Sequence, residues 1–126
     1  MINQRVWSVI KMSTTIIGRL TADPEISFSN SGNAITRFTV AISLTKGGRE
    51  QVSYFDCSSW GTLAKGIAES LHKGDRIIME GRLVQEPYET ADGKSVTRTV
   101  ILADAVGPDL RFQTAVVSQN PRPLVN

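Results

Sequence analysis

The stretch that decides the fold is Val52–Leu83, which reads VSYFDCSSWGTLAKGIAESLHKGDRIIMEGRL. Its first part predicts a strand, in which alternate side chains point to opposite faces. Tyr54 and Trp60 fall on the same face, and six residues at ~3.3 Å each separate them by roughly 20 Å. That spacing suits several stacked bases better than one small ligand. The alternative is that both rings are ordinary barrel or interface residues.

A single helix is predicted directly after this strand. Leu63, Ile67 and Leu71 recur every fourth residue, and Gly74 is expected to end the helix. The apolar stripe predicts that the helix closes one end of a barrel. His72, the lone histidine, suits the negative end of the helix dipole, so we expect no metal or catalytic role for it.

Two further strands are predicted before this stretch. Residues 14–21, TTIIGRLT, are rich in β-branched side chains, and Gly18 within them indicates a bulge or a close backbone approach. Residues 34–44, AITRFTVAISL, alternate in polarity and place Arg37 on the polar face, where it can meet a phosphate or simply be solvated. Residues 46–49, KGGR, then predict a flexible basic turn.

Two long strands are predicted after the helix. Residues 75–106 contain Asp92-Gly93, a strong hairpin signal, and Pro87 indicates an edge strand or one that has left the sheet. The hairpin is expected to project as a flexible arm that carries Tyr88, Lys94 and Arg98.

Together these elements predict an all-β fold with one short helix. Five strands with a helix between the third and fourth match a five-stranded OB-fold barrel, with a long protruding hairpin between the fourth and fifth strands. Small SH3-like barrels share much of this pattern and remain an alternative. We expect a flexible N-terminal extension over residues 1–12, the OB domain over 13–112 and a short C-terminal tail over 113–126.

The composition argues against several classes of protein. The 126 residues, 40% of them apolar, suffice for one domain with a core, and no apolar run is long enough to span a bilayer. With one Cys and one His the chain carries no catalytic or metal-binding motif, so we expect no enzyme, metal or cofactor. Glu86 and Glu89 are expected to solvate a loop. The single cysteine agrees with a reducing compartment.

What remains is binding by rings and positive charge. Bases that stack on aromatic side chains contribute about 1–3 kcal/mol each with little dependence on sequence, and cations hold the phosphates. The stacking candidates are Tyr54, Trp60 and Tyr88. The phosphate-binding candidates are Arg37, Lys46, Arg49, Lys65, Arg82, Lys94 and Arg98.

Two segments carry a family resemblance: GRLTADPE at residues 18–25 and KGDRIIMEGRL at residues 73–83. With the elements around them, they make residues 13–112 similar to bacterial single-stranded DNA-binding proteins. The resemblance implies an OB fold, a homotetramer, and protection of single-stranded DNA during replication, recombination and repair. It also implies that aromatic residues on the third strand and the long hairpin stack on bases, and the matching positions are Tyr54, Trp60 and Tyr88.

The sequence departs from this family in two places. No ring lies near Lys46, where well-studied members carry a stacking tryptophan, so an electrostatic contact is expected there. The chain stops at NPRPLVN without an acidic residue, so tail-mediated recruitment of repair proteins is not expected. An OB-fold protein-interaction subunit, primosome-like and with weak DNA contact, is the alternative function. The expected location is the cytoplasm, associated with the nucleoid, with an organelle as the alternative.

Overall fold

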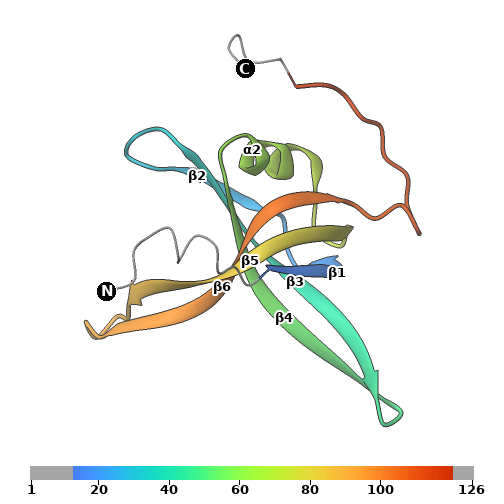
Figure 1. The fold of residues 1–126 in the computed structure, drawn as a ribbon, viewed down its shortest axis with the longest axis horizontal. Helices are drawn as coiled ribbons and strands as arrows, with labels where there is room; N and C mark the ends of the chain where they lie inside the picture. The colour runs from blue at the N-terminus through green and yellow to red at the C-terminus, as the bar shows by residue number, and fades with distance from the viewer. Residues whose placement is uncertain (1–12, 121–126) are drawn as a thin grey trace.

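The computed structural model describes residues 13–120, so the predicted extension 1–12 and the last six residues of the predicted tail lie outside the described part. The described chain forms six strands and one helix (Figure 1). They are β1 (Ser13–Leu20), β2 (Glu25–Phe28), β3 (Ala34–Lys46), β4 (Arg49–Trp60), α2 (Gly61–Ser70), β5 (Arg76–Glu89) and β6 (Ser95–Pro108). No helix in this range is long and apolar enough to cross a membrane.

The strands form one sheet that closes on itself. Their order is β1-β5-β6-β4-β3-β2, and β1 also pairs with β3 through Arg19↔Ala41 and Leu20↔Val40. This contact closes five strands into a barrel, while β2 pairs with β3 outside the closed circuit. β4 and β6 run parallel, whereas the other neighbouring strands of the described chain are antiparallel. The predicted five-stranded OB-type barrel with one helix is confirmed.

Alternation along the strands separates the core from the outer surface. In β3, Val40 is fully buried while Arg37 is exposed, as the sequence pattern predicts. The helix α2 covers one end of the barrel (Figure 1), and its Ala64 and Ile67 are buried. The Oγ1 of Thr36 donates a hydrogen bond of 2.7 Å to the carbonyl of Ala64, which fixes the helix to β3. Burial of this apolar stripe is what holds so short a helix in place.

Two glycines allow neighbouring strands to approach closely. A Cβ atom at Gly18 would lie 2.5 Å from the carbonyl oxygen of Ala41, which confirms the predicted close approach in β1. A Cβ atom at Gly81 would lie 2.5 Å from the carbonyl oxygen of Leu102, next to a register shift at which β6 has one extra residue, Asp104. Both glycines therefore permit the curvature that closes the barrel.

The structure differs from the sequence prediction in two elements. The short strand β2 was not predicted, because all four of its residues are exposed and carry no alternation of burial. The helix ends at Ser70 and not at Gly74, since Leu71 is already extended with φ −113° and ψ 146°. Gly74, with φ +88°, lies in the following turn, where its N–H donates to the carbonyl of Leu20. Its left-handed conformation serves the turn into β5.

Two hairpins extend away from the barrel (Figure 1). The β3–β4 hairpin closes with Lys46 opposite Arg49, and both intervening glycines have positive φ, as a tight two-residue turn requires. Because β1 pairs with β5 only as far as Arg82, β5 and β6 continue alone as a two-stranded arm, residues 83–100. Pro87 lies on this arm, where the outer edge of β5 has no neighbouring strand in the described chain. The predicted projecting hairpin is therefore present.

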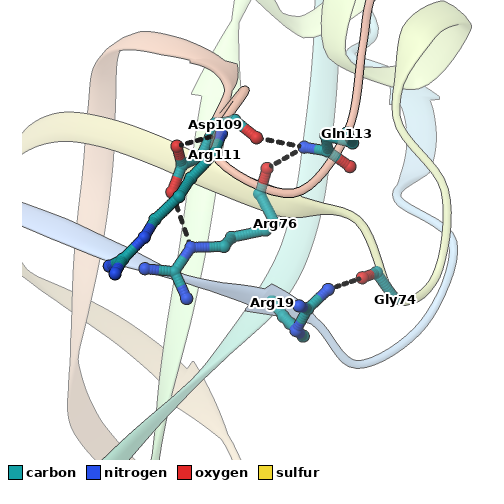
Figure 2. A network of polar contacts seen from close by, with 6 residues as sticks. All are labelled: Arg19, Gly74, Arg76, Asp109, Arg111 and Gln113. Atoms are coloured by element: carbon teal, nitrogen blue, oxygen red, sulfur yellow. Dashed lines mark hydrogen bonds and ion pairs between the residues drawn. The ribbon is translucent and has the colours of Figure 1, made fainter.

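The chain is fixed to the barrel where it leaves β6 (Figure 2). The Nε of Arg76 donates to Asp109 Oδ2 at 2.5 Å, and the Asp109 N–H donates back to the Arg76 carbonyl. The Gln113 amide donates to the carbonyls of both residues, at 2.6 and 2.8 Å. We call Arg76, Asp109 and Gln113 the C-terminal clasp.

Candidate nucleic-acid interface

Large rings lie on the outer face of β4. Tyr54 and Trp60 are 66% and 50% exposed, whereas Cys57 and Ser59, with the opposite parity, are buried. An aromatic ring on the outside of a barrel exposes apolar surface to water, which is unfavourable. Contact with another molecule would cover that surface, so the position of these rings favours such a contact. The two rings therefore share one face of β4, as the alternation predicts, and that face is the outer one.

The register of β3 places polar side chains beside these rings. Thr39 lies opposite Asp56, and Arg37 lies opposite Ser58. We call this surface the β3–β4 face; it consists of Ile35, Arg37, Thr39, Tyr54, Asp56, Ser58 and Trp60.

The third predicted ring is on the arm. Tyr88 is 46% exposed, and the Cζ atom of Arg98 lies 5.6 Å from the centre of its ring. In the arm, Glu86 pairs with Arg98 across the two strands. Because Glu86 and Tyr88 share one parity of β5, this cation and this ring belong to the same surface of the arm.

A groove runs between the β3–β4 face and the base of the arm. It consists of two adjoining cavities of about 250 and 200 Å³, which share Arg37, Ser58, Glu86 and Val100. The larger cavity also contains Asp56 and Arg98, and the smaller one Trp60. We call the two cavities together the arm groove. It brings together three of the predicted binding residues: Arg37, Trp60 and Arg98.

Two ion pairs cross the arm groove. The Nη2 of Arg37 lies 3.8 Å from Glu86 Oε1, and the Nη1 of Arg98 lies 3.9 Å from Asp56 Oδ2. Asp56 Oδ1 also accepts a hydrogen bond of 3.1 Å from Thr39 Oγ1. Glu86 is thus a strand residue with a partner and does not solvate a loop; Glu89 likewise lies in β5, not in a loop. Sequence reasoning missed the pairing because it depends on where the base of the arm lies relative to β3.

The remaining predicted cations lie outside the arm groove. Lys46 and Arg49 are at the tip of the β3–β4 hairpin, Lys94 is in the turn of the arm, and Lys65 is on α2. Arg82 donates hydrogen bonds of 3.1 and 3.0 Å to the two carboxylate oxygens of Asp104.

The described residues hold no cluster of His, Cys, Asp and Glu that could bind a metal ion. Burial, together with the nearby Asp56 carboxylate, raises the pKa of the Cys57 thiol to about 12. The thiol therefore stays protonated near neutral pH, and the thiolate, which is the nucleophilic form, is not populated. His72 lies in the turn after α2, where its backbone N–H donates to Asp75 Oδ2. The groups that the β3–β4 face and the arm present are rings and cations.

Comparison with known proteins points the same way. The model of the single-strand binding protein family matches residues 12–109. A single-stranded DNA-binding protein of Mycolicibacterium smegmatis is 39% identical over 115 residues, which cover 86% of this chain and 70% of the relative. One from Mycobacterium leprae is 40% identical over 115 residues, with 86% and 68% covered. One from Bifidobacterium longum is 39% identical over 112 residues, with 83% and 51% covered.

Proposed function

The chain belongs to the single-strand binding protein family, and on this premise we propose that it binds single-stranded DNA along the β3–β4 face and the arm. The observation that carries the proposal is the exposure of three large rings, Tyr54, Trp60 and Tyr88, on these two surfaces. Every base has a π-face, so stacking on these rings reads the single-stranded form and not the sequence.

Cations around the rings supply the electrostatic part of binding. The proposed phosphate contacts are Lys46, Arg49 and Lys94 at the tips of the two hairpins. Arg37 and Arg98 line the arm groove, where each faces a carboxylate. We do not include Lys65 and Arg82 among the proposed DNA contacts. Lys65 is on the helix, and Arg82 is committed to Asp104 by two hydrogen bonds. Phosphate contacts of this kind make the affinity fall as salt rises.

We propose further that the protein protects single strands during replication, recombination and repair, in the cytoplasm and associated with the nucleoid. We also propose that it acts as a homotetramer. An apolar pair on the outside of the barrel supports self-association, because Ile17 and Ile78 lie opposite each other in β1 and β5 and are both exposed. Adjacent exposed apolar side chains are typical of surfaces that associate.

Tryptophan fluorescence tests the stacking. The chain has a second tryptophan, Trp7, so a Trp7→Phe background leaves Trp60 as the only reporter. Titration with oligo(dT) is expected to give saturable quenching that weakens with salt and survives competition by duplex DNA of the same length. Absence of both quenching and salt-sensitive binding would overturn the proposal.

A pair of variants separates stacking from a general effect of removing a ring. Trp60→Ala should weaken oligo(dT) binding by about 5- to 150-fold, the equivalent of the roughly 1–3 kcal/mol of one stacked base. Phe28→Ala is the control, because Phe28 is an exposed ring on β2, outside the β3–β4 face, and should leave the affinity unchanged. If Trp60→Ala instead dissociates the assembly and spares DNA affinity, the ring is an interface residue, and the protein-interaction role is favoured.

A further inference from the structure

Two of the carboxylates on the surface that is proposed to bind a polyanion face arginines across the arm groove. Asp56 is on β4 between Tyr54 and Trp60, with the same outward parity as both rings. Glu86 lies across the arm groove from it, on β5. Negative charge at these two positions opposes any phosphate that comes close, so their presence needs a physical explanation.

Each of these carboxylates faces an arginine. Asp56 is fixed by the Thr39 hydroxyl at 3.1 Å and faces Arg98 at 3.9 Å. Glu86 faces Arg37 at 3.8 Å. The two pairs line one cavity of about 250 Å³, whose lining also includes the carboxylates Asp23 and Glu25. The arginines inside the arm groove are therefore neutralised by residues of the same protein.

The two ion pairs are also weak enough for the arginines to change partners. Neither pair includes a hydrogen bond, in contrast to Arg82 and Asp104, whose two hydrogen bonds measure 3.1 and 3.0 Å. Exposed ion pairs at such distances are weak and are screened by salt.

We propose that Asp56 and Glu86 determine specificity: they exclude polyanions that lack accessible bases and leave the binding of single strands largely unaffected. The inference rests on the proposed function. A single strand that stacks on Tyr54 and Trp60 passes uncharged bases over Asp56, and its phosphates can lie toward the cations at the hairpin tips. A duplex or heparin offers no unstacked base to these rings, so its charged backbone groups approach the carboxylates of the arm groove.

This is selectivity by repulsion of the wrong partner. Removing both carboxylates would free Arg37 and Arg98 for up to two additional ionic contacts. Each contact with duplex DNA adds about 0.9 to the slope of log affinity against log salt. The freed arginines are expected to strengthen duplex and heparin binding about tenfold or more near 0.1 M salt, whereas oligo(dT) affinity should change less than about threefold.

The experiment compares two double variants with the same change in net charge. Asp56→Asn/Glu86→Gln removes the two carboxylates that face arginines across the arm groove. Glu69→Gln/Glu80→Gln removes two others, one on α2 and one on the part of β5 that pairs with β1. Binding of oligo(dT), a duplex of equal length and heparin is measured for each variant and for the wild type at several salt concentrations.

The expected result is a loss of discrimination in the first variant only, with a duplex salt slope steeper by about 1–2. Equal gains in both variants would assign the effect to net charge and overturn the inference. A gain for oligo(dT) as large as that for duplex DNA would overturn it as well. Wild-type binding of oligo(dT) in the same series tests the proposed function separately, because that binding stands even if the carboxylates prove indifferent.

Discussion

Closure of the barrel depends on a residue without a side chain, and Gly18→Ala tests this directly. The added Cβ would lie 2.5 Å from the Ala41 carbonyl oxygen and 2.7 Å from Val40 Cγ1. Ordinary contact begins near 3.4 Å, so the strands must separate by nearly an ångström. The obstacle is backbone and cannot rotate away. The separation would occur where β1 and β3 share only the pairs Arg19↔Ala41 and Leu20↔Val40.

The magnitude follows from two opposing effects. Overpacking of this kind costs about 1–3 kcal/mol, and a backbone obstacle places the cost near the upper end. Replacing glycine by alanine also restricts the unfolded chain, which returns about 0.4–1 kcal/mol. We therefore expect the free energy of unfolding to fall by about 2 kcal/mol, equivalent to a drop in Tm of about 8 °C for a domain of this size.

Urea denaturation followed by circular dichroism measures the change, at one fixed protein concentration because self-association alters apparent stability. Gly66→Ala is the matched control. Gly66 is inside α2, and a Cβ atom there meets nothing within 4 Å, so this variant should be more stable by about 0.5–1 kcal/mol. If Gly18→Ala is as stable as the wild type while Gly66→Ala shows its gain, the close approach does not limit closure, and the reasoning is refuted.

Three further outcomes are expected. Ser59→Ala should keep or raise the free energy of unfolding by up to about 1 kcal/mol in urea denaturation, because the buried Ser59 hydroxyl has no hydrogen-bond partner among the described residues. The folded protein should resist thiol labelling of Cys57 at pH 8 and react once unfolded. Because the Cys57 pKa is raised to about 12 from 9.0, this residue's contribution to stability should be complete below pH 9 and disappear toward pH 12, unlike in Cys57→Ala. The hydrogen bond from Arg76 lowers the Asp109 pKa, so the stability that Asp109 contributes should be present above its ordinary pKa of 3.8 and disappear at lower pH. In denaturation measured as a function of pH, Asp109→Asn should lack this loss of stability in acid.

Much of the architecture could be predicted because the signals are local. Alternation in β3 and β4 placed Arg37, Tyr54 and Trp60 on the outer face, and Asp92-Gly93 marked the turn of the arm. A period of two and a turn dipeptide each depend on a few neighbouring residues, so no tertiary information is needed.

The rest depends on contacts between distant residues. β2 forms because β3 has an open edge, which its own four exposed residues do not reveal. The helix was expected to continue to Gly74, but the backbone is already extended at Leu71. The turn that follows is held by the hydrogen bond from the Gly74 N–H to the Leu20 carbonyl, a contact between distant residues. The pairing of Glu86 with Arg37 joins residues 49 positions apart in sequence. Such pairings arise only when the arm and the barrel are in place.

The C-terminal clasp determines the geometry of tethering. It holds the chain at Gln113, at the end of β6 opposite the tip of the arm (Figure 1). A fully extended segment from there to residue 120 reaches at most about 24 Å. Anything attached to this segment would therefore be tethered to the end of β6 opposite the tip of the arm, and the length of the segment would limit how far it can reach.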